Sequence, residues 1–132
     1  MLKLLYGALL ALFSTTALAN AGADGTWRTE SSEEGGYLEV TMAPCATDAG
    51  RTCGVISKAN DGKGPDASYE HLGKLMVKDM QSEGGGYFSD GTIWDPQADK
   101  TYKSKMQVNG NELEVDGCIA FLCSGQTWTR VQ

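Results

Sequence analysis

Residues 101–117 read Thr-Tyr-Lys-Ser-Lys-Met-Gln-Val-Asn-Gly-Asn-Glu-Leu-Glu-Val-Asp-Gly, and this stretch decides the fold class. Asn109-Gly110 is a favoured centre for a two-residue hairpin turn, because both central residues take positive φ there. A turn at this dipeptide gives the cross-strand pairs Met106–Leu113, Ser104–Val115, Lys105–Glu114, Lys103–Asp116 and Gln107–Glu112. Apolar residues then gather on one face and opposite charges meet on the other, which fixes the register. The stretch predicts an antiparallel hairpin with one buried face.

The rest of the chain after residue 20 alternates apolar and polar residues in the same way, although less regularly. Further strands are predicted at 37–42, 53–58, 72–80, 87–94 and 126–131, with a bulge or tight bend at Asp90-Gly91. Residues 59–71 form the longest polar loop, which is rich in Gly and contains a Pro. About eight short strands in meander order predict an all-β protein, either a small antiparallel up-and-down barrel or a strongly curled sheet.

Two short stretches at the ends of this series of strands form a pair. Gly25-Thr26-Trp27 lies at the start, and Trp128-Thr129-Arg130 lies near the C-terminus. A Gly-x-Trp on the first strand with an Arg on the last resembles the pairing that closes one end of calycin-type β-barrels. The resemblance implies that the first and last strands meet. We expect Trp27 to be buried and Arg130 to lie across its ring.

Residues 1–19 have the pattern of a secretory signal peptide. Lys3 supplies the positive charge, Leu4 to Phe13 is a short apolar run, and Ala17-Leu18-Ala19 is a small-x-small cleavage site. The apolar run is far shorter than the ~20 residues that span a bilayer. Cleavage after Ala21 is the alternative. We therefore expect residues 20–132 to form a single soluble domain that is periplasmic or secreted, with no membrane span.

Four cysteines in an exported chain predict two disulfides. Cys45 and Cys53 enclose a short loop, and so do Cys118 and Cys123; neither spacing matches the Cys-x-x-Cys pairs of zinc sites. The local pairing, Cys45 with Cys53 and Cys118 with Cys123, is favoured, and the two crossed pairings stay open. Short closed loops stabilise a fold by about 2–3 kcal/mol each in the chain-entropy model. Their expected role is to pin the ends of hairpins.

Charge and side-chain chemistry argue against several classes of function. The formal net charge is −6 and no cluster of Lys and Arg is present, which argues against nucleic acid and anionic membranes as partners. The one histidine, His71, lies at the edge of a polar loop with no Gly-x-Ser-x-Gly motif nearby. Asp61, Asp66 and Glu70 miss the spacing of a calcium-binding loop. We expect no catalytic residues, no cofactor and no metal, and hence a protein that is not an enzyme.

Several short motifs occur in an order that is typical of one family. They are Gly25-x-Trp27, Pro44-Cys45, Cys53-Gly54-x-Ile56, Gly91-Thr92-Ile93-Trp94-Asp95-Pro96, Lys100-Thr101-Tyr102, Gly117-Cys118 to Leu122-Cys123, and Gln126-Thr127-Trp128-Thr129-Arg130-Val131. In order and spacing the chain resembles the exported bacterial family called domain of unknown function 2147 (DUF2147). The resemblance implies a calycin-like barrel, of the lipocalin or avidin kind, and no established activity. Residues 60–71 depart from the family pattern, since they are shorter and lack its Asn-Pro-Asp and Arg-rich run.

A barrel of about eight strands leaves two functional classes, because it either holds one small ligand or is filled by its own side chains. The residues expected to line a site for a small apolar or amphipathic ligand are Leu38, Val40, Met42, Tyr102, Met106, Leu113, Val115 and Trp128. The alternative is that these side chains pack the interior. The second class is an envelope protein-interaction or inhibitor-like module. Its contact patch is Ile119, Phe121 and Leu122, which either lie exposed between two cysteines or tuck in as a plug.

Overall fold

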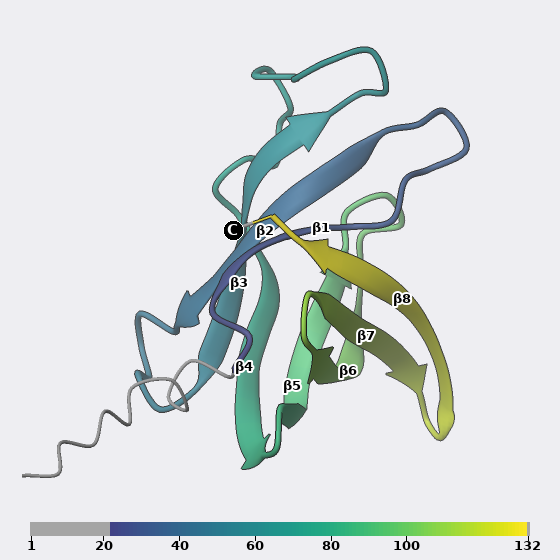
Figure 1. Ribbon diagram of the computed structural model, residues 1–132. Helices are drawn as coiled ribbons and strands as arrows, with labels where there is room; N and C mark the ends of the chain where they lie inside the picture. The colour runs from purple at the N-terminus through teal and green to yellow at the C-terminus, as the bar shows by residue number, and fades with distance from the viewer. Residues whose placement is uncertain (1–21, 132) are drawn as a thin grey trace, which may run out of the picture.

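The computed structural model describes residues 22–131, whose regular structure is β-strand throughout. The strands are β1 (Gly25–Arg28), β2 (Tyr37–Pro44), β3 (Thr52–Asn60), β4 (Leu75–Gly84), β5 (Tyr87–Asp95), β6 (Lys100–Asn109), β7 (Glu112–Ile119) and β8 (Leu122–Arg130). Each strand pairs antiparallel with the next and β1 pairs back with β8, so the sheet closes into an up-and-down barrel (Figure 1). The predicted all-β barrel is confirmed. The signal peptide predicted at 1–19 lies outside the described residues.

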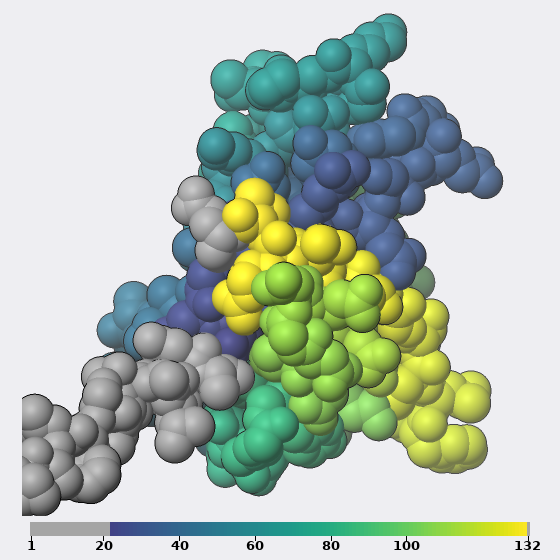
Figure 2. Space-filling view, viewed as in Figure 1, coloured from purple at the N-terminus to yellow at the C-terminus, as the bar shows by residue number. Residues whose placement is uncertain are grey.

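The meander order sends the strand connections to two ends of the barrel. The β1–β2, β3–β4, β5–β6 and β7–β8 connections belong to one end, which we call the mouth; Figure 1 shows the first and last of them on the right. The start of β1 and the β2–β3, β4–β5 and β6–β7 turns belong to the other end, the closed end. In Figure 2 the β3–β4 connection (teal, at the top) and the tip of the β7–β8 hairpin (lower right) project from the body of the molecule.

The β6–β7 hairpin forms, but its register differs by two residues from the one the sequence predicts. Met106 pairs with Val115, and the two-residue loop is Gly110-Asn111 rather than Asn109-Gly110, so the predicted cross-strand pairs are wrong. Gly110 has φ +64°, whereas Asn111 has no positive φ. This is the pattern of a type II′ turn, which needs glycine only at its first central position. A shift of two residues leaves every side chain on its face, so the apolar face is the predicted one.

The other strands differ from prediction mainly at their ends. β4 begins at Leu75 rather than at residue 72, because Gly73 turns the chain with φ +87° just before it. β8 begins at Leu122 rather than at residue 126. Its first part contains the small residues Cys123, Ser124 and Gly125, which show no alternation of apolar and polar residues that would predict a strand. The predicted bulge in β5 is present: the register shifts before Gly91, and Asp90 has φ +63°. The sequence therefore predicts which segments form strands, but it misplaces the first residues of β4 and β8.

Large apolar side chains pack the closed half of the barrel. The largest fully buried ones are Trp27, Trp128, Met42, Ile56, Met80, Met106, Leu113, Val40 and Val77. The segment before β1 covers this end, where Ala23 is buried and its carbonyl oxygen accepts a hydrogen bond from Trp27 Nε1 at 2.7 Å. The guanidinium of Arg130 lies over the Trp27 ring, 4.2 Å from its centroid. The N-terminal segment and the last strand therefore seal the closed end together.

Each disulfide joins the ends of one hairpin. Cys45–Cys53 links the end of β2 to β3 at the closed end, and Cys118–Cys123 links directly opposite residues of β7 and β8 near the mouth. This is the local pairing favoured from the sequence. No cysteine in residues 22–131 is free. Two disulfides in so short a chain indicate an oxidising environment, extracellular or periplasmic.

Candidate functional site

The mouth half of the barrel is not filled by side chains. It holds a cavity of about 600 Å³. The apolar and aromatic residues that line it include Met76, Ile93, Trp94, Tyr102, Val115 and Trp128, with Ile119 and Leu122 at its edge. The polar side chains that line it are Asp95, Gln97, Ser124 and Gln126. A volume of ~300–1,000 Å³ with a mainly apolar wall and few polar groups is typical of small-molecule sites.

Small residues that point inward keep this half of the barrel open. Gly117 and Ser124 are opposite one another on β7 and β8, and both line the cavity. A Cβ on Gly117 would lie 3.4 Å from Ile93 Cγ2 and from Tyr102 Cβ, so these side chains rest against the glycine. Nearer the closed end the same faces of β7 and β8 carry Leu113 and Trp128, which fill their half. The taper in side-chain size produces the cavity.

A second pocket of about 370 Å³ adjoins the cavity beneath the β1–β2 and β3–β4 connections. It shares Met76, Asp95, Gln97 and Gln126 with the cavity. The residues that it adds include Glu30, Tyr37, Leu38, Asp61, Asp66 and Tyr69. The mouth of the barrel is therefore one broad hollow whose deep part is apolar and whose outer part is polar and acidic.

Aromatic rings and hydrogen bonds organise the wall of the hollow. The His71 ring packs edge-on against Tyr69 and Trp94, with centroids 5.3 and 5.0 Å apart. Trp94 Nε1 donates to Asp99 Oδ1 at 2.9 Å, which orients the indole. Trp128 Nε1 donates to Gln126 Oε1 at 2.8 Å. That bond holds the amide of Gln126, a residue that lines both the cavity and the adjoining pocket.

The charged side chains that line the mouth are acidic: Glu30, Asp61, Asp66 and Asp95. Burial raises the pKa of the Tyr69 hydroxyl above its ordinary value, and the charges of Glu70 and Asp95 raise it further. The hydrogen bond from the Lys63 backbone N–H lowers the pKa of the Asp61 carboxyl, which keeps that group ionised. The Tyr69 shift has the direction expected beside carboxylates, whereas the Asp61 shift reflects its hydrogen bonds to backbone N–H groups and the nearby charge of Lys63.

The residues predicted to bind a ligand separate into two groups. Tyr102, Val115 and Trp128 line the cavity, and Leu38 lines the adjoining pocket. The other four belong to the packed closed half and line neither hollow; they are Val40, Met42, Met106 and Leu113. The sequence thus selected the correct inward faces of the strands but did not separate the two halves of the barrel.

Several lining residues were missed by the sequence reasoning. Ser124 and Gln126 share a face of β8 with Trp128, so extending the alternation backward from Trp128 would have found them. Ile93 and Trp94 belong to a strand that was predicted but assigned no face. Met76 gives no such signal, because adjacent Met76 and Val77 are both buried and so break the strict alternation of β4.

The predicted contact patch lies at the tip of the β7–β8 hairpin and points into solvent. The exposed fractions are 66% for Ile119, 90% for Phe121 and 70% for Leu122. The alternative in which this tip plugs the barrel is therefore wrong for Phe121, which reaches away from the fold. Ala120 takes φ +57° in the two-residue loop, and the Cys118–Cys123 disulfide closes the hairpin behind it. Ile119 and Leu122 also line the edge of the cavity.

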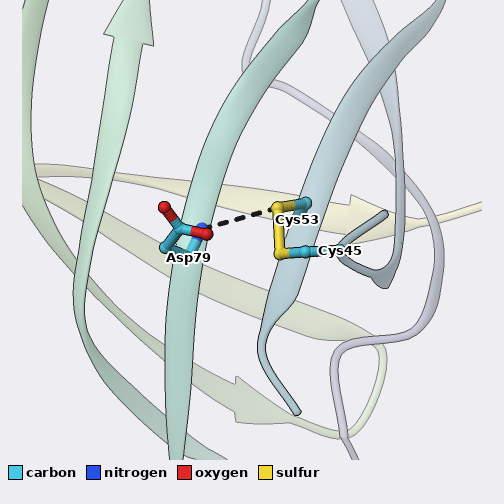
Figure 3. Close-up of side chains that lie close together, drawn as sticks. All are labelled: Cys45, Cys53 and Asp79. Carbon is cyan, nitrogen blue, oxygen red and sulfur yellow. Dashed lines mark hydrogen bonds between the residues drawn. A yellow bond between two sulfur atoms is a disulfide. The ribbon is translucent and has the colours of Figure 1, made fainter. Parts of the chain in front are cut away.

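Neither His71 nor the acidic loop residues form a recognisable catalytic or metal-binding group. His71 lies beside Glu70, whose Oε1 is 3.3 Å from Nε2, and beside Lys74, whose Nζ is 3.0 Å from Nδ1. Within residues 22–131, one cluster of three metal-ligand side chains occurs, Cys45, Cys53 and Asp79. Figure 3 shows that its two sulfurs are bonded to each other, so they offer no thiolate. The Asp79 N–H donates to Cys53 Sγ at 3.5 Å, which ties the disulfide to β4.

In the part of the chain that the structure describes, no helix has the length and apolar character needed to cross a membrane.

The barrel is similar to a solved structure, protein HP1028 from the human pathogen Helicobacter pylori, which is described as belonging to the lipocalin family. The similarity has a TM-score of 0.60 and 16% sequence identity, and it covers 83% of this chain and 82% of that chain. At this identity the likeness concerns the fold. No curated protein matches the chain.

The model of one protein family matches residues 25–130, the whole span from β1 to β8. The family is described as an uncharacterized protein conserved in bacteria, DUF2147. The chain belongs to the DUF2147 family.

Proposed function

We propose that this protein is a non-enzymatic binding module that holds a small apolar or amphipathic molecule in the mouth of its barrel. The observation that carries the proposal is the cavity of about 600 Å³ above a packed closed half. Its wall combines aromatic and aliphatic side chains with few polar groups. We further propose that the protein acts in the periplasm or outside the cell, after removal of residues 1–19 as a signal peptide. The two disulfides support that location.

A ligand would enter from the mouth, since the closed end is sealed by the segment around Ala23 and by Arg130. Its apolar part would pack against Ile93, Val115 and Trp128. Burial contributes about 0.8 kcal/mol per CH₂ group, so six to eight buried methylenes give roughly 5–6 kcal/mol. An affinity between millimolar and micromolar follows. This range sets the probe concentrations for the test.

The test is a fluorescence titration with the neutral apolar probe N-phenyl-1-naphthylamine. Trp94 and Trp128 line the cavity, so bound probe should quench their emission. The variant Ser124→Trp places an indole inside the cavity and should weaken probe binding at least tenfold. Its matched control is Thr129→Trp, at an exposed position on the outer face of the same strand, which should bind like the unmodified protein.

Circular dichroism should show that both variants keep the β-sheet signal. Failure of the probe to bind the unmodified protein contradicts the proposal, and so does unchanged binding by Ser124→Trp. Native mass spectrometry of protein purified from its own envelope gives an independent measurement. A retained small mass supports ligand binding.

A second candidate function rests on the exposed tip of the β7–β8 hairpin. Ile119, Phe121 and Leu122 present three apolar side chains on a disulfide-closed loop, and Phe121 is 90% exposed. Such a tip suits insertion into an apolar pocket of another envelope protein, with Phe121 as the anchor. Three side chains cover too little area for a standard interface of ~800 Å² per partner. The contact would therefore be weak or inhibitor-like.

A photo-crosslinking amino acid at position 121 tests this second function in intact cells. The expected result is one identified protein partner, crosslinked at 121 and not at the control position 129. Loss of that crosslink in the variant Ile119→Ser would tie the contact to the apolar tip. Equal crosslinking at both positions would contradict a specific contact.

A further inference from the structure

The side chains that line the mouth have an asymmetric charge. Four carboxylates line the cavity and the adjoining pocket; they are Glu30, Asp61, Asp66 and Asp95. No Lys, Arg or His is among the described residues that line either hollow. An amphipathic ligand whose apolar part fills the cavity places its headgroup among these four carboxylates.

Backbone amides hold the carboxylates in place without neutralising them. Asp66 Oδ1 accepts from the Ser68 N–H at 3.0 Å, and Asp95 Oδ1 accepts from the Gln97 N–H at 2.9 Å. Glu30 Oε2 accepts from the Thr127 N–H at 2.7 Å, which anchors this side chain of the β1–β2 connection to β8.

Within residues 22–131, no Lys, Arg or His nitrogen lies within 4.0 Å of the oxygens of these four carboxylates. The salt bridges of residues 22–131 involve other acidic groups, Asp48, Glu70 and Asp90. The charge of Lys63 contributes to the lowered pKa of Asp61, and Lys100 is the register partner of Asp95, but neither lysine lines the hollow. The charge of the mouth is thus available to a ligand.

Aromatic rings stand beside the carboxylates. Trp94, Tyr102 and Trp128 line the cavity, and Tyr69 lines the adjoining pocket. Tyr37 also lines that pocket, but the Arg28 guanidinium already covers one face of its ring, 3.7 Å from the centroid. Aromatic faces attract cations that lie within about 6 Å of the ring centroid, and quaternary ammonium ligands are recognised in this way. Carboxylates and aromatic rings together favour a positive headgroup, whereas a carboxylate headgroup would meet like charges. The raised pKa of Tyr69 agrees with this, because negative charges of Glu70 and Asp95 contribute to it.

We infer that the ligand class of the mouth is an amphipathic cation, an alkylamine or alkylammonium, in preference to a fatty acid. This inference rests on the proposed function, since it assigns the headgroup of the molecule that the cavity would hold. The apolar chain supplies most of the affinity, and the acidic mouth supplies the selectivity.

The experiment compares three amphiphiles with the same ten-carbon chain, each below its micelle concentration at low salt and neutral pH. They are decyltrimethylammonium, decanol and decanoate, and each displaces N-phenyl-1-naphthylamine from the protein. We expect the cation to compete at least tenfold more strongly than decanoate, with decanol between them. The preference should shrink as salt is added, because salt screens exposed charges.

The outcomes test the preference for a cation separately from the proposed binding of a small apolar or amphipathic molecule. Equal competition by the three amphiphiles, or stronger competition by decanoate, overturns the cation inference and leaves a general binder of apolar chains. Absence of probe binding overturns the proposed function itself.

Charge-removing variants identify the residues that carry the preference. In Asp66→Asn/Asp95→Asn the amide oxygens can keep the hydrogen bonds from Ser68 and Gln97 while two charges are lost. The cation should then lose at least fivefold in affinity, while decanol binds as before. The control Asp48→Asn/Asp90→Asn removes two charges in the closed half, where both carboxylates pair with Arg51. If this control loses the cation preference equally, net charge rather than the mouth is responsible, and the inference fails.

Discussion

Arg130 lies across the indole ring of Trp27, with the guanidinium carbon 4.2 Å from the ring centroid, and the two residues are register partners on β8 and β1. The seam between these strands is short, with two register pairs, whereas β7 and β8 share eight. Arg130 Nη1 also donates to the carbonyl oxygen of Asp24 at 3.0 Å. Side-chain contacts therefore supplement a short backbone seam at the point where the barrel closes.

Replacing Trp27 by alanine should destabilise the protein by ~3–5 kcal/mol, because it removes a large, fully buried side chain and leaves a cavity. Urea unfolding followed by circular dichroism measures the loss. The control is Trp94→Ala at the partly exposed mouth, which should cost clearly less. A Trp27→Ala variant that loses no more than Trp94→Ala would show that the closure contributes little to stability.

The two disulfides should differ in their resistance to reduction. Cys45 and Cys53 are buried, whereas Cys123 is exposed near the hairpin tip. Mild reductant should therefore open Cys118–Cys123 first, as detected by thiol alkylation and peptide mapping. The variant Cys118→Ser/Cys123→Ser should lose about 2 kcal/mol of stability, as expected for a short loop. Earlier reduction of Cys45–Cys53 would contradict the predicted order, and recovery of a Cys45–Cys118 peptide would contradict the observed pairing.

The barrel could be predicted from the sequence because its signals are local. The alternation around Met106 and the Asn109-Gly110 turn identified a hairpin, and Trp27 and Arg130 marked the strands that meet. The register failed for a physical reason: Asn109, Gly110 and Asn111 offer two possible loops, which differ by a two-residue shift that preserves both faces. Met106 lies on the apolar face with either loop, so the alternation of apolar and polar residues does not choose between them.

The cavity was harder to predict because it exists where the inward-facing residues are small, and the sequence patterns detect large apolar residues. Gly117 and Ser124 leave the space, and neither residue carries an apolar signal. The acidic mouth brings together Glu30 and Asp66, from two strand connections, and Asp95, the last residue of β5, so no stretch of sequence contains it. Once the strand order is known, these positions follow from the meander, which returns every second connection to the same end.

Replacing Gly91 by alanine should destabilise the barrel by about 1–3 kcal/mol. A Cβ at this buried position would lie 2.5 Å from the Lys78 carbonyl oxygen and 2.9 Å from Met80 Cα, so the backbones of β4 and β5 would have to separate. The matched control is Gly64→Ala in the β3–β4 connection, where nothing lies within 4 Å. It should stay within ~0.5 kcal/mol of the unmodified protein in urea unfolding. Equal stability of the two variants would show that β4 and β5 can adjust at the bulge.

Tyr69 should titrate above the ordinary tyrosine pKa of 10.0. Because the folded-state pKa is raised, the folded protein keeps this proton where the unfolded chain releases it. The stability contribution is complete below pH 10 and is lost as the pH rises towards the folded-state pKa. The ultraviolet absorbance of tyrosinate measures the titration of all the tyrosines. The part of the absorbance change that is lost in Tyr69→Phe belongs to Tyr69. Asp95→Asn should shift that component to lower pH. A Tyr69 component at or below pH 10 would contradict the negative mouth.

Replacing Met106 by tryptophan distinguishes the packed half of the barrel from the open half. Met106 is 1% exposed and pairs with Phe88 and Val115, so a larger ring there overpacks the interior. The expected cost is about 1–3 kcal/mol, which lowers the melting temperature by roughly 5–15 °C. Binding of the apolar probe should survive at low temperature, because Met106 does not line the cavity. The comparison is Ser124→Trp, which should lose the probe while keeping its melting temperature nearer that of the unmodified protein. If Met106→Trp keeps the melting temperature of the unmodified protein but no longer binds the probe, the hollow extends to the closed end. The buried residues Val40, Met42, Met106 and Leu113 would then belong to the binding site.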